Sequence, residues 1–215
     1  SGNLKKISFI QNKSLELCLF LSLPATFALL IASEEITSAL FGYGSFDIVS
    51  VKNSSKALFY FALGLPAFSI IKIFSSFLFA RHNTKIPFYF SLFSVLLNIS
   101  ISLYFFNRVG FIIIPIATTI SSWFNTLILM IYLINKNYFS LTTNFFKSFI
   151  KICVSSIISC FIFSYLINFF SKNLSYESEY KLIYIICLVI LTVIIYLLIS
   201  VATKALKISD INLRY

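Results

Sequence analysis

Charged residues are scarce in this chain. They make up 11% of it, against 59% hydrophobic residues, and the mean hydropathy is +0.95. That balance excludes a soluble domain of ordinary composition. The apolar residues gather into stretches near the roughly 20 residues that a helix needs to cross a membrane. There are six of them: Leu17–Phe41, Ala57–Ala80, Ile86–Phe106, Gly110–Ile134, Ile152–Phe170 and Leu182–Thr203.

These stretches are too long and too evenly apolar to be strands of a membrane barrel. The sequence therefore predicts an all-α, polytopic membrane protein with six transmembrane helices. Polar connections join the spans and leave no room for a soluble domain. The longest are expected near Gly42–Lys56 and Asn135–Lys151.

The usual catalytic motifs are also missing. The chain has no H-E-x-x-H, G-x-G-x-x-G, P-loop or G-x-S-x-G pattern, so the common machinery of hydrolysis, phosphoryl transfer or hydride transfer has no place here. We expect no enzyme activity and no cofactor. The single histidine, His82, lies in a basic turn without a neighbouring carboxylate and is interpreted as a loop residue rather than a proton relay.

Cysteine use gives no sign of metal or disulfide chemistry. The chain has four cysteines and no C-x-x-C pair, and all four lie inside predicted spans. Buried thiols in apolar surroundings behave as small hydrophobic groups. They are Cys18, Cys153, Cys160 and Cys187.

A net charge of +10 is the one compositional feature that would suit a nucleic acid. The placement of the charge indicates a membrane topology instead. If the spans alternate in direction, segments on one side hold eleven of the 17 Lys and Arg residues and those on the other side hold five. Cytoplasmic loops carry the Lys/Arg excess, so both termini are predicted to be cytoplasmic. Five or seven spans would break this asymmetry.

Two features inside the spans leave alternatives open. Pro24 and Pro66 should kink their helices, because proline removes a hydrogen bond and clashes with the preceding turn. Such kinks either serve packing or mark a transport site. Lys72 costs about 2.5–3.5 kcal/mol near the centre of a span. It is either a functional ionisable group or a snorkelling side chain.

Polar residues elsewhere provide further candidates. Arg81 and Lys85 flank a short basic turn that either anchors the topology or contacts lipid phosphate. Asn98 and the hydroxyl residues of Gly110–Ile134 either bond neighbouring helices together or line a polar cavity. The last two spans have few strongly polar residues and suit lipid or a greasy groove.

Read in order, a set of local segments resembles the MurJ/MviN family of lipid II flippases, within the multidrug and oligosaccharidyl-lipid exporters. The similarity is dense over residues 1–138 and weak beyond. The most specific part is the Phe-Ala-Arg-x-x-Thr-x-x-Pro stretch after the helix that bears Lys72. The segments are Ser1–Asn3, Leu19–Ala25, Leu40–Phe46, Tyr60–Phe68, Ile71–Ile73, Phe79–Pro87, Leu97–Asn98 and Val109–Gly110.

This resemblance implies helices nine to fourteen of a fourteen-helix, two-lobe fold, and so the C-terminal part of a longer protein. Residues 1–138 would hold four helices of the C-terminal lobe. Residues 139–215 would hold the last two helices, which form a groove for a polyprenyl tail, and a cytoplasmic tail. The central cavity and its arginines would lie mostly on helices absent from this sequence. A start at Ser-Gly-Asn without Met agrees with a piece of a longer chain.

The implied function is moving lipid II, the undecaprenyl-pyrophosphate-linked peptidoglycan precursor, across the bacterial inner membrane by alternating access. Its partners would be lipid II, membrane lipids and the missing N-terminal portion, with no nucleic acid. Lys72, Arg81, Lys85 and Asn98 are the candidate substrate-binding residues, and no metal site is expected. The alternatives are a fragment of a polysaccharide-lipid flippase and a membrane scaffold that transports nothing.

Overall fold

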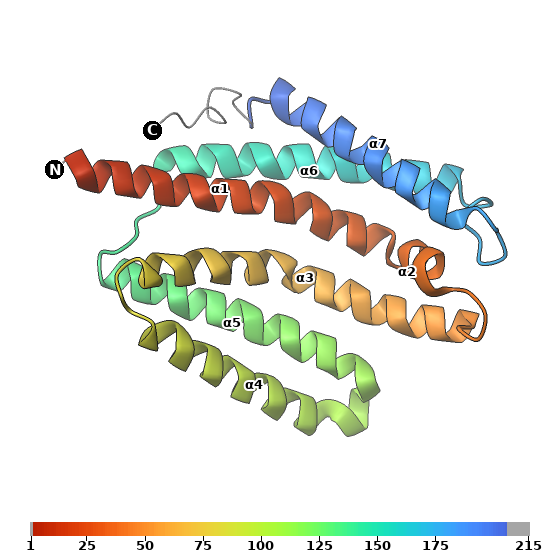
Figure 1. Ribbon diagram of the computed structural model, residues 1–215, viewed down its shortest axis with the longest axis horizontal. Coiled ribbons are helices and arrows are strands. Elements are labelled where there is room, and N and C mark those ends of the chain that lie inside the picture. Colours follow the sequence, from red (N-terminus) through yellow and green to blue (C-terminus); the bar gives the residue numbers. More distant parts are fainter. Residues whose placement is uncertain (1, 206–215) are drawn as a thin grey trace. The chain divides into compact units, whose positions relative to one another are not determined.

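The computed structural model is described here for residues 2–205, with side chains from Lys6 onward (Figure 1). Within that range the chain forms seven α-helices and one short 3-10 turn, and no strand. The all-α prediction is thus confirmed. The helices are α1 (Gly2–Ile31), α2 (Ser33–Phe41), α3 (Ile48–Phe79), α4 (Lys85–Val109), α5 (Ile113–Asn135), α6 (Thr143–Phe169) and α7 (Lys181–Ala202), with the 3-10 turn at Gly110–Ile112.

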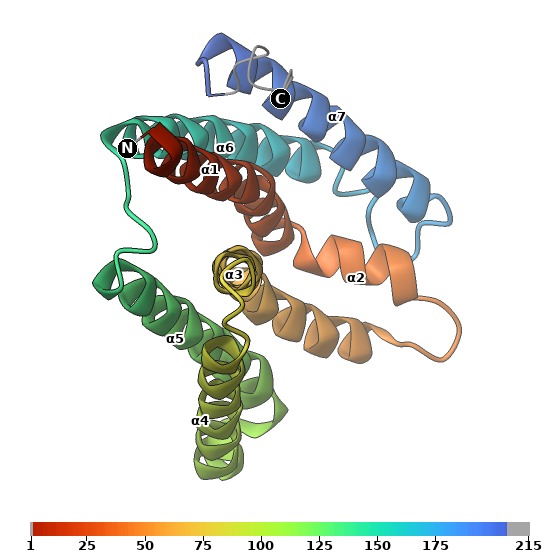
Figure 2. The ribbon, with the colours of Figure 1, turned by 60° about the vertical axis from the view of Figure 1, so that its left-hand side comes forward.

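Among the described residues, five helical segments are long and apolar enough to cross a membrane. The longest, Lys85–Asn135, is a hairpin rather than one helix (Figures 1 and 2). It turns at Gly110, whose φ of 75° is a left-handed conformation that glycine adopts without the penalty of a Cβ. The two arms are α4 and α5, so the apolar helices correspond in number to the six predicted spans.

The predicted first span, Leu17–Phe41, is wrong at both ends. The helix begins at Gly2 and ends at Ile31, and Ser33–Phe41 forms the separate helix α2. Two acidic residues, Glu34 and Glu35, occupy the first turn of α2, where the helix dipole favours negative charge. At the other end, the polar Gln11 and Asn12 lie within α1 because hydrogen bonds to distant backbone groups allow their burial.

The two predicted long connections are also wrong. Helix α3 already begins at Ile48, and α6 begins at Thr143. Both helices have polar residues in their first turns, and for this reason the sequence predicts connections there. At α3, Asp47 accepts a hydrogen bond of 2.8 Å from the Ser50 amide, which caps the helix. The same bond lowers the pKa of the Asp47 carboxyl below its usual range.

The described residues divide into two compact units. Unit 1 contains the chain up to Ser22 together with Tyr60–Phe146, and unit 2 contains Leu23–Phe59 together with the chain from Lys147 onward. Helices α1, α3 and α6 each contribute to both units. This division of the chain differs from the family-based one at residue 138, which stays a prediction.

In unit 1, α5 donates hydrogen bonds to backbone carbonyls of α3 around Pro66. Thr119 Oγ1 donates to Tyr60 O at 2.6 Å, and Thr126 Oγ1 to Ala67 O at 3.2 Å. Between them, Trp123 Nε1 donates to Leu63 O at 3.0 Å. The carbonyl that loses its helical donor at Pro66 is that of Ala62. The three bonds go to other carbonyls, on both sides of the proline. These polar residues of α5 therefore bond neighbouring helices together, which is the first of the two alternatives predicted for them.

Gly64 lies on α3 in this contact. A Cβ added there would be 3.0 Å from both Thr119 Oγ1 and the Phe68 ring. The absence of a side chain lets α5 approach the α3 backbone closely, as small residues do in membrane helix pairs.

In unit 2, the core joins the end of α6 to the start of α7 and to α2. Its largest fully buried member is Phe163 of α6, at 1% exposed. Farther along these antiparallel helices, the Ser155 and Thr203 hydroxyls are 2.9 Å apart. Small buried serines let α6 and α7 pack closely here. The buried core comprises Ala32, Ala39, Phe163, Ile167, Leu174, Ile185 and Leu188.

Candidate functional site

Arg81 holds the connection between α5 and α6. It lies two residues after the end of α3, and its side chain is half-buried. Its Nη2 donates to Tyr138 O at 3.2 Å, and its guanidinium carbon is 4.6 Å from the centroid of the Tyr138 ring. Its Nη1 donates back to Phe77 O at 3.2 Å. Beside it, Phe139 is buried against the rings of Phe74 and Phe77.

The first half of α1 meets the same connection. Gln11 Nε2 donates to Tyr138 O at 3.1 Å, and Asn12 Nδ2 donates to Ser140 O at 2.8 Å. Asn12 Oδ1 accepts from the Thr142 amide at 3.1 Å, and Thr142 Oγ1 caps α6 by accepting from the Phe145 amide. Three Lys/Arg-rich segments thus meet at one end of unit 1. The sequence predicted that they share a side of the membrane.

Of the other predicted site residues, Lys72 and Lys85 are exposed and Asn98 is not. Lys72 lies in α3 on the face opposite the buried Phe74 and Leu78. Lys85 is the first residue of α4. Asn98 Nδ2 donates to Thr118 Oγ1 at 3.0 Å across the α4–α5 hairpin. The structure places these three side chains in different surroundings, and their role in substrate binding stays a prediction.

In the sequence, Lys181 is one of the five basic residues on the side with fewer Lys and Arg. The structure buries it to 1% exposed at the start of α7. Its Nζ donates to Gly42 O and Tyr176 O, each at 2.7 Å. It also lies 4.4 Å and 4.5 Å from the ring centroids of Tyr43 and Tyr176. The lysine thereby joins the α2–α3 connection to the α6–α7 connection.

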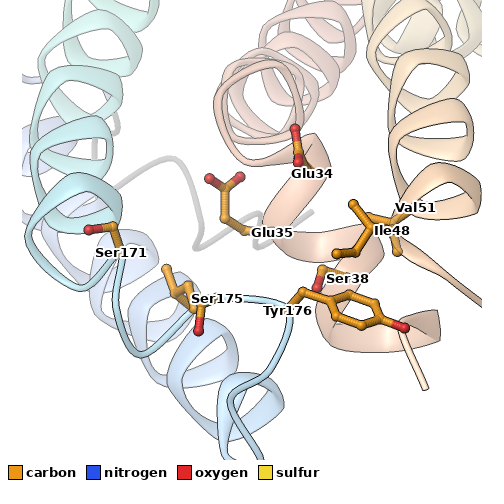
Figure 3. Close-up of a pocket in the computed structure, with 9 residues that line it drawn as sticks. Glu34, Glu35, Ser38, Ile48, Val51, Ser171, Ser175 and Tyr176 are labelled. Atoms are coloured by element: carbon orange, nitrogen blue, oxygen red, sulfur yellow. The ribbon is translucent and has the colours of Figure 1, made fainter. Parts of the chain in front are cut away.

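A cavity of about 200 Å³ opens in unit 2 beside α2 (Figure 3). Its polar lining comes from Glu34, Glu35 and Ser38 of α2 and from the segment after α6, and α3 supplies an apolar wall. Burial raises the pKa of the Glu35 carboxyl, and the neighbouring charge of Glu34 adds to that effect. The lining residues are Glu34, Glu35, Ser38, Ile48, Val51, Ser171, Leu174, Ser175 and Tyr176.

Comparison with known proteins decides the family. The model of the family described as lipid II flippase MurJ matches residues 1–185 of this chain. The chain belongs to the MurJ family. This confirms the resemblance that the local segments carried, and the family match extends beyond residue 138, where the resemblance is weak.

Curated MurJ relatives agree with the family match. The chain is 39% identical over 137 residues to a probable lipid II flippase MurJ of Rhizobium meliloti, covering 64% of this chain and 26% of that one. It is 36% identical over 132 residues to one of Rickettsia prowazekii, covering 61% and 26%. The matched part spans about a quarter of the length of these relatives.

A solved structure shares the MurJ fold with this chain. It is a lipid II flippase MurJ in an inward closed conformation, with a TM-score of 0.73 and 26% identity. The match covers 93% of this chain and 40% of that one. The polytopic membrane fold class predicted from the sequence is confirmed.

We expect Arg81→Met to release the connection between α5 and α6 in this MurJ chain. The change removes two hydrogen bonds and a cation–ring contact, and should lower the free energy of unfolding by about 2 kcal/mol. Arg81→Lys should have an intermediate effect, because an ammonium lacks the fork that reaches two carbonyls. Amide hydrogen exchange at Tyr138–Ser140 measures the release. Lys85→Met is the control, and unchanged exchange in Arg81→Met would contradict the prediction.

Proposed function

We propose that this chain is the C-terminal part of a lipid II flippase, a transporter rather than an enzyme, which moves the lipid-linked peptidoglycan precursor across the inner membrane by alternating access. The observation that carries the proposal is the family match over residues 1–185. The likeness to a MurJ structure over 93% of this chain supports it. The remaining helices and most of the central cavity would come from an N-terminal portion of the same protein.

The charged head group needs counter-charge while it passes through hydrocarbon. Lys72 is suited to that role because it is exposed within a long apolar helix. Arg81 acts through the α5–α6 connection rather than by contact with the substrate, since its guanidinium is committed to Tyr138 and Phe77. Lys85 contacts lipid phosphate at the membrane surface, and Asn98 positions α4 against α5.

The polyprenyl tail and the surrounding membrane lipids lie against apolar helix faces. Helices α6 and α7 expose large hydrophobic side chains along their length, including Ile150, Phe161 and Leu198. Small residues and the Ser155–Thr203 hydroxyl pair pack α6 directly against α7. The tail therefore follows their outer faces.

Both ends of the chain are proposed to be cytoplasmic. The Lys/Arg excess on one side supports this orientation. Within unit 1, hydrogen bonds join α1, the end of α3 and the α5–α6 connection, and these are segments from the Lys-rich side. The predicted tail beyond Ala205 lies outside the described residues.

The test is rescue of cells depleted of their own flippase by the full-length protein that contains this chain. Wild type should restore growth and lipid II exposure on the outer leaflet. Lys72→Ala should reduce that exposure at least ~10-fold, because about 1.4 kcal/mol of lost transition-state stabilisation is a tenfold change in rate. Lys72→Arg should keep most of it. Full rescue by Lys72→Ala would remove this residue from the proposal, and failure of wild type at normal membrane levels would remove the function.

A further inference from the structure

Five large apolar side chains lie exposed around the connection between α2 and α3, each between 47% and 63% exposed. Some of them fall in a stretch that the sequence predicts to be a polar connection. Apolar side chains that gather on a surface, unlike single exposed ones, mark an interaction site. We call this group the α2–α3 corner. It consists of the last two residues of α2, the first two of α3 and a tyrosine between them: Leu40, Phe41, Tyr43, Ile48 and Val49.

A contact with α7 indicates the depth of this corner in the membrane. Helix α7 has 22 residues and no charged residue after its first, Lys181. At 1.5 Å per residue its length is about 33 Å, which is close to the roughly 30 Å of a hydrocarbon core. Lys181 therefore lies at a membrane–water interface. Its ammonium donates to Gly42 O at 2.7 Å and lies 4.4 Å from the centroid of the Tyr43 ring, so the corner lies at the same interface.

A second contact holds the corner at this depth. Tyr176, in the connection between α6 and α7, donates from its hydroxyl to Phe46 O at 2.9 Å. Helix α2 also packs on α7, and Ala39 belongs to their shared buried core. Within unit 2, the start of α3 and the α6–α7 connection lie at the same end (Figures 1 and 2). The corner is therefore fixed level with the start of α7.

The aromatic residues near the corner are those of a membrane interface. Tyrosine is enriched where lipid head groups meet the hydrocarbon, because its ring is apolar and its hydroxyl is polar. The two connections at this end of unit 2 contain three tyrosines: Tyr43, Tyr176 and Tyr180. Tyr180 is 62% exposed. The ring centroids of Phe41 and Phe46 are 6.2 Å apart, which adds a further aromatic pair to this end.

Two exposed lysines follow the corner in α3. Lys52 and Lys56 are four residues apart and so lie on one face of the helix. Side chains in a helix lean towards its N-terminus, which for α3 is the corner. A long lysine stem can lie along apolar helix surface while its ammonium extends to the head groups. The two lysines are therefore suited to meet lipid phosphate at the level of the corner.

We propose that the α2–α3 corner inserts into the bilayer at the boundary between head groups and acyl chains and anchors this end of unit 2. Amphipathic elements of this kind are buried about 5–10 Å into that boundary. A soluble partner protein would have to reach the corner at the depth where α7 enters the membrane, which favours lipid as the occupant. The anchor requires the membrane fold, and it would hold whether or not the protein transports lipid II.

The test adds one tryptophan at a time to the protein that contains this chain, reconstituted in phosphatidylcholine vesicles. Phe41→Trp and Val49→Trp report on the corner, and the fluorescence of the parent protein is subtracted. Both positions are exposed, so they accept the larger ring without repacking. Lipids brominated near the head group should quench both reporters at least ~2-fold more than lipids brominated near the chain end, as expected for the boundary region.

Two matched controls bracket the depth. Ile190→Trp, at an exposed position halfway along α7, should be quenched most by the chain-end bromines. Glu177→Trp, at an exposed acid of the α6–α7 connection, should be quenched most by iodide in the aqueous phase. Iodide quenching of the corner reporters equal to that of Glu177→Trp would overturn the proposal, because the corner would then lie in water. Quenching by neither bromine nor iodide would overturn it as well, since a protein segment would then cover the corner.

Discussion

Lys181→Met is expected to lower the free energy of unfolding by about 3 kcal/mol. Methionine fills a similar volume but leaves the backbone oxygens of Gly42 and Tyr176 without their donor in a buried site. Each such orphaned group costs about 1–3 kcal/mol. The contacts of the ammonium with the Tyr43 and Tyr176 rings are lost as well. Thermal unfolding in detergent micelles measures the change.

The control is Lys172→Met, which removes an exposed lysine from the same connection and should shift stability by less than about 0.5 kcal/mol. Hydrogen exchange adds a local measure, because the α2–α3 connection should exchange faster in Lys181→Met and not in the control. If the two variants unfold alike, the buried lysine does not hold the two connections together.

No sequence pattern points to this lysine contact. Gly42 is 139 residues away from Lys181 along the chain, and the partner atoms are backbone oxygens that any residue carries. Hydropathy and charge counting register Lys181 as one more basic residue at the end of a span. Its burial depends on the turn that exposes the Gly42 carbonyl, which is a tertiary feature.

Helix existence was predictable, whereas helix ends were not. Hydropathy measures transfer of side chains into lipid, so it finds the apolar part of each helix. It does not register that Gln11 and Asn12 satisfy backbone groups 127 and 128 residues away, which makes them interior residues of α1. Nor does hydropathy detect the break between α1 and α2, so the predicted first span continued through Glu34 and Glu35 to Phe41.

Polar residues within the spans were read more successfully. The sequence favoured bonding between helices for Asn98 and the hydroxyls of the fourth span, because hydrocarbon offers polar groups no other partner. The Asn98–Thr118 bond and the bonds from Thr119 and Thr126 to α3 confirm that reading. The close approach of the two helices at Gly64 brings these donors within reach of α3 backbone oxygens.

Gly64→Leu is expected to separate α5 from α3 and to lower the free energy of unfolding by about 3 kcal/mol, at the upper end of the cost of overpacking. Even a Cβ at this position would be 3.0 Å from Thr119 Oγ1 and from the Phe68 ring. A larger side chain has to push α5 away, which stretches the bonds from Thr119, Trp123 and Thr126 to α3. Thermal unfolding in micelles measures the loss.

Smaller changes at the same contact identify its cause. Gly64→Ala gains about 1 kcal/mol of helix propensity, which offsets part of the steric cost. Combining it with Thr119→Ala removes one of the crowded atoms, so the double variant should be more stable than the sum of the two single effects predicts. Ser76→Leu, at an exposed position of the same helix, is the control for added apolar volume. If the two single effects simply add, the missing side chain at Gly64 is not what allows α5 to pack closely on α3.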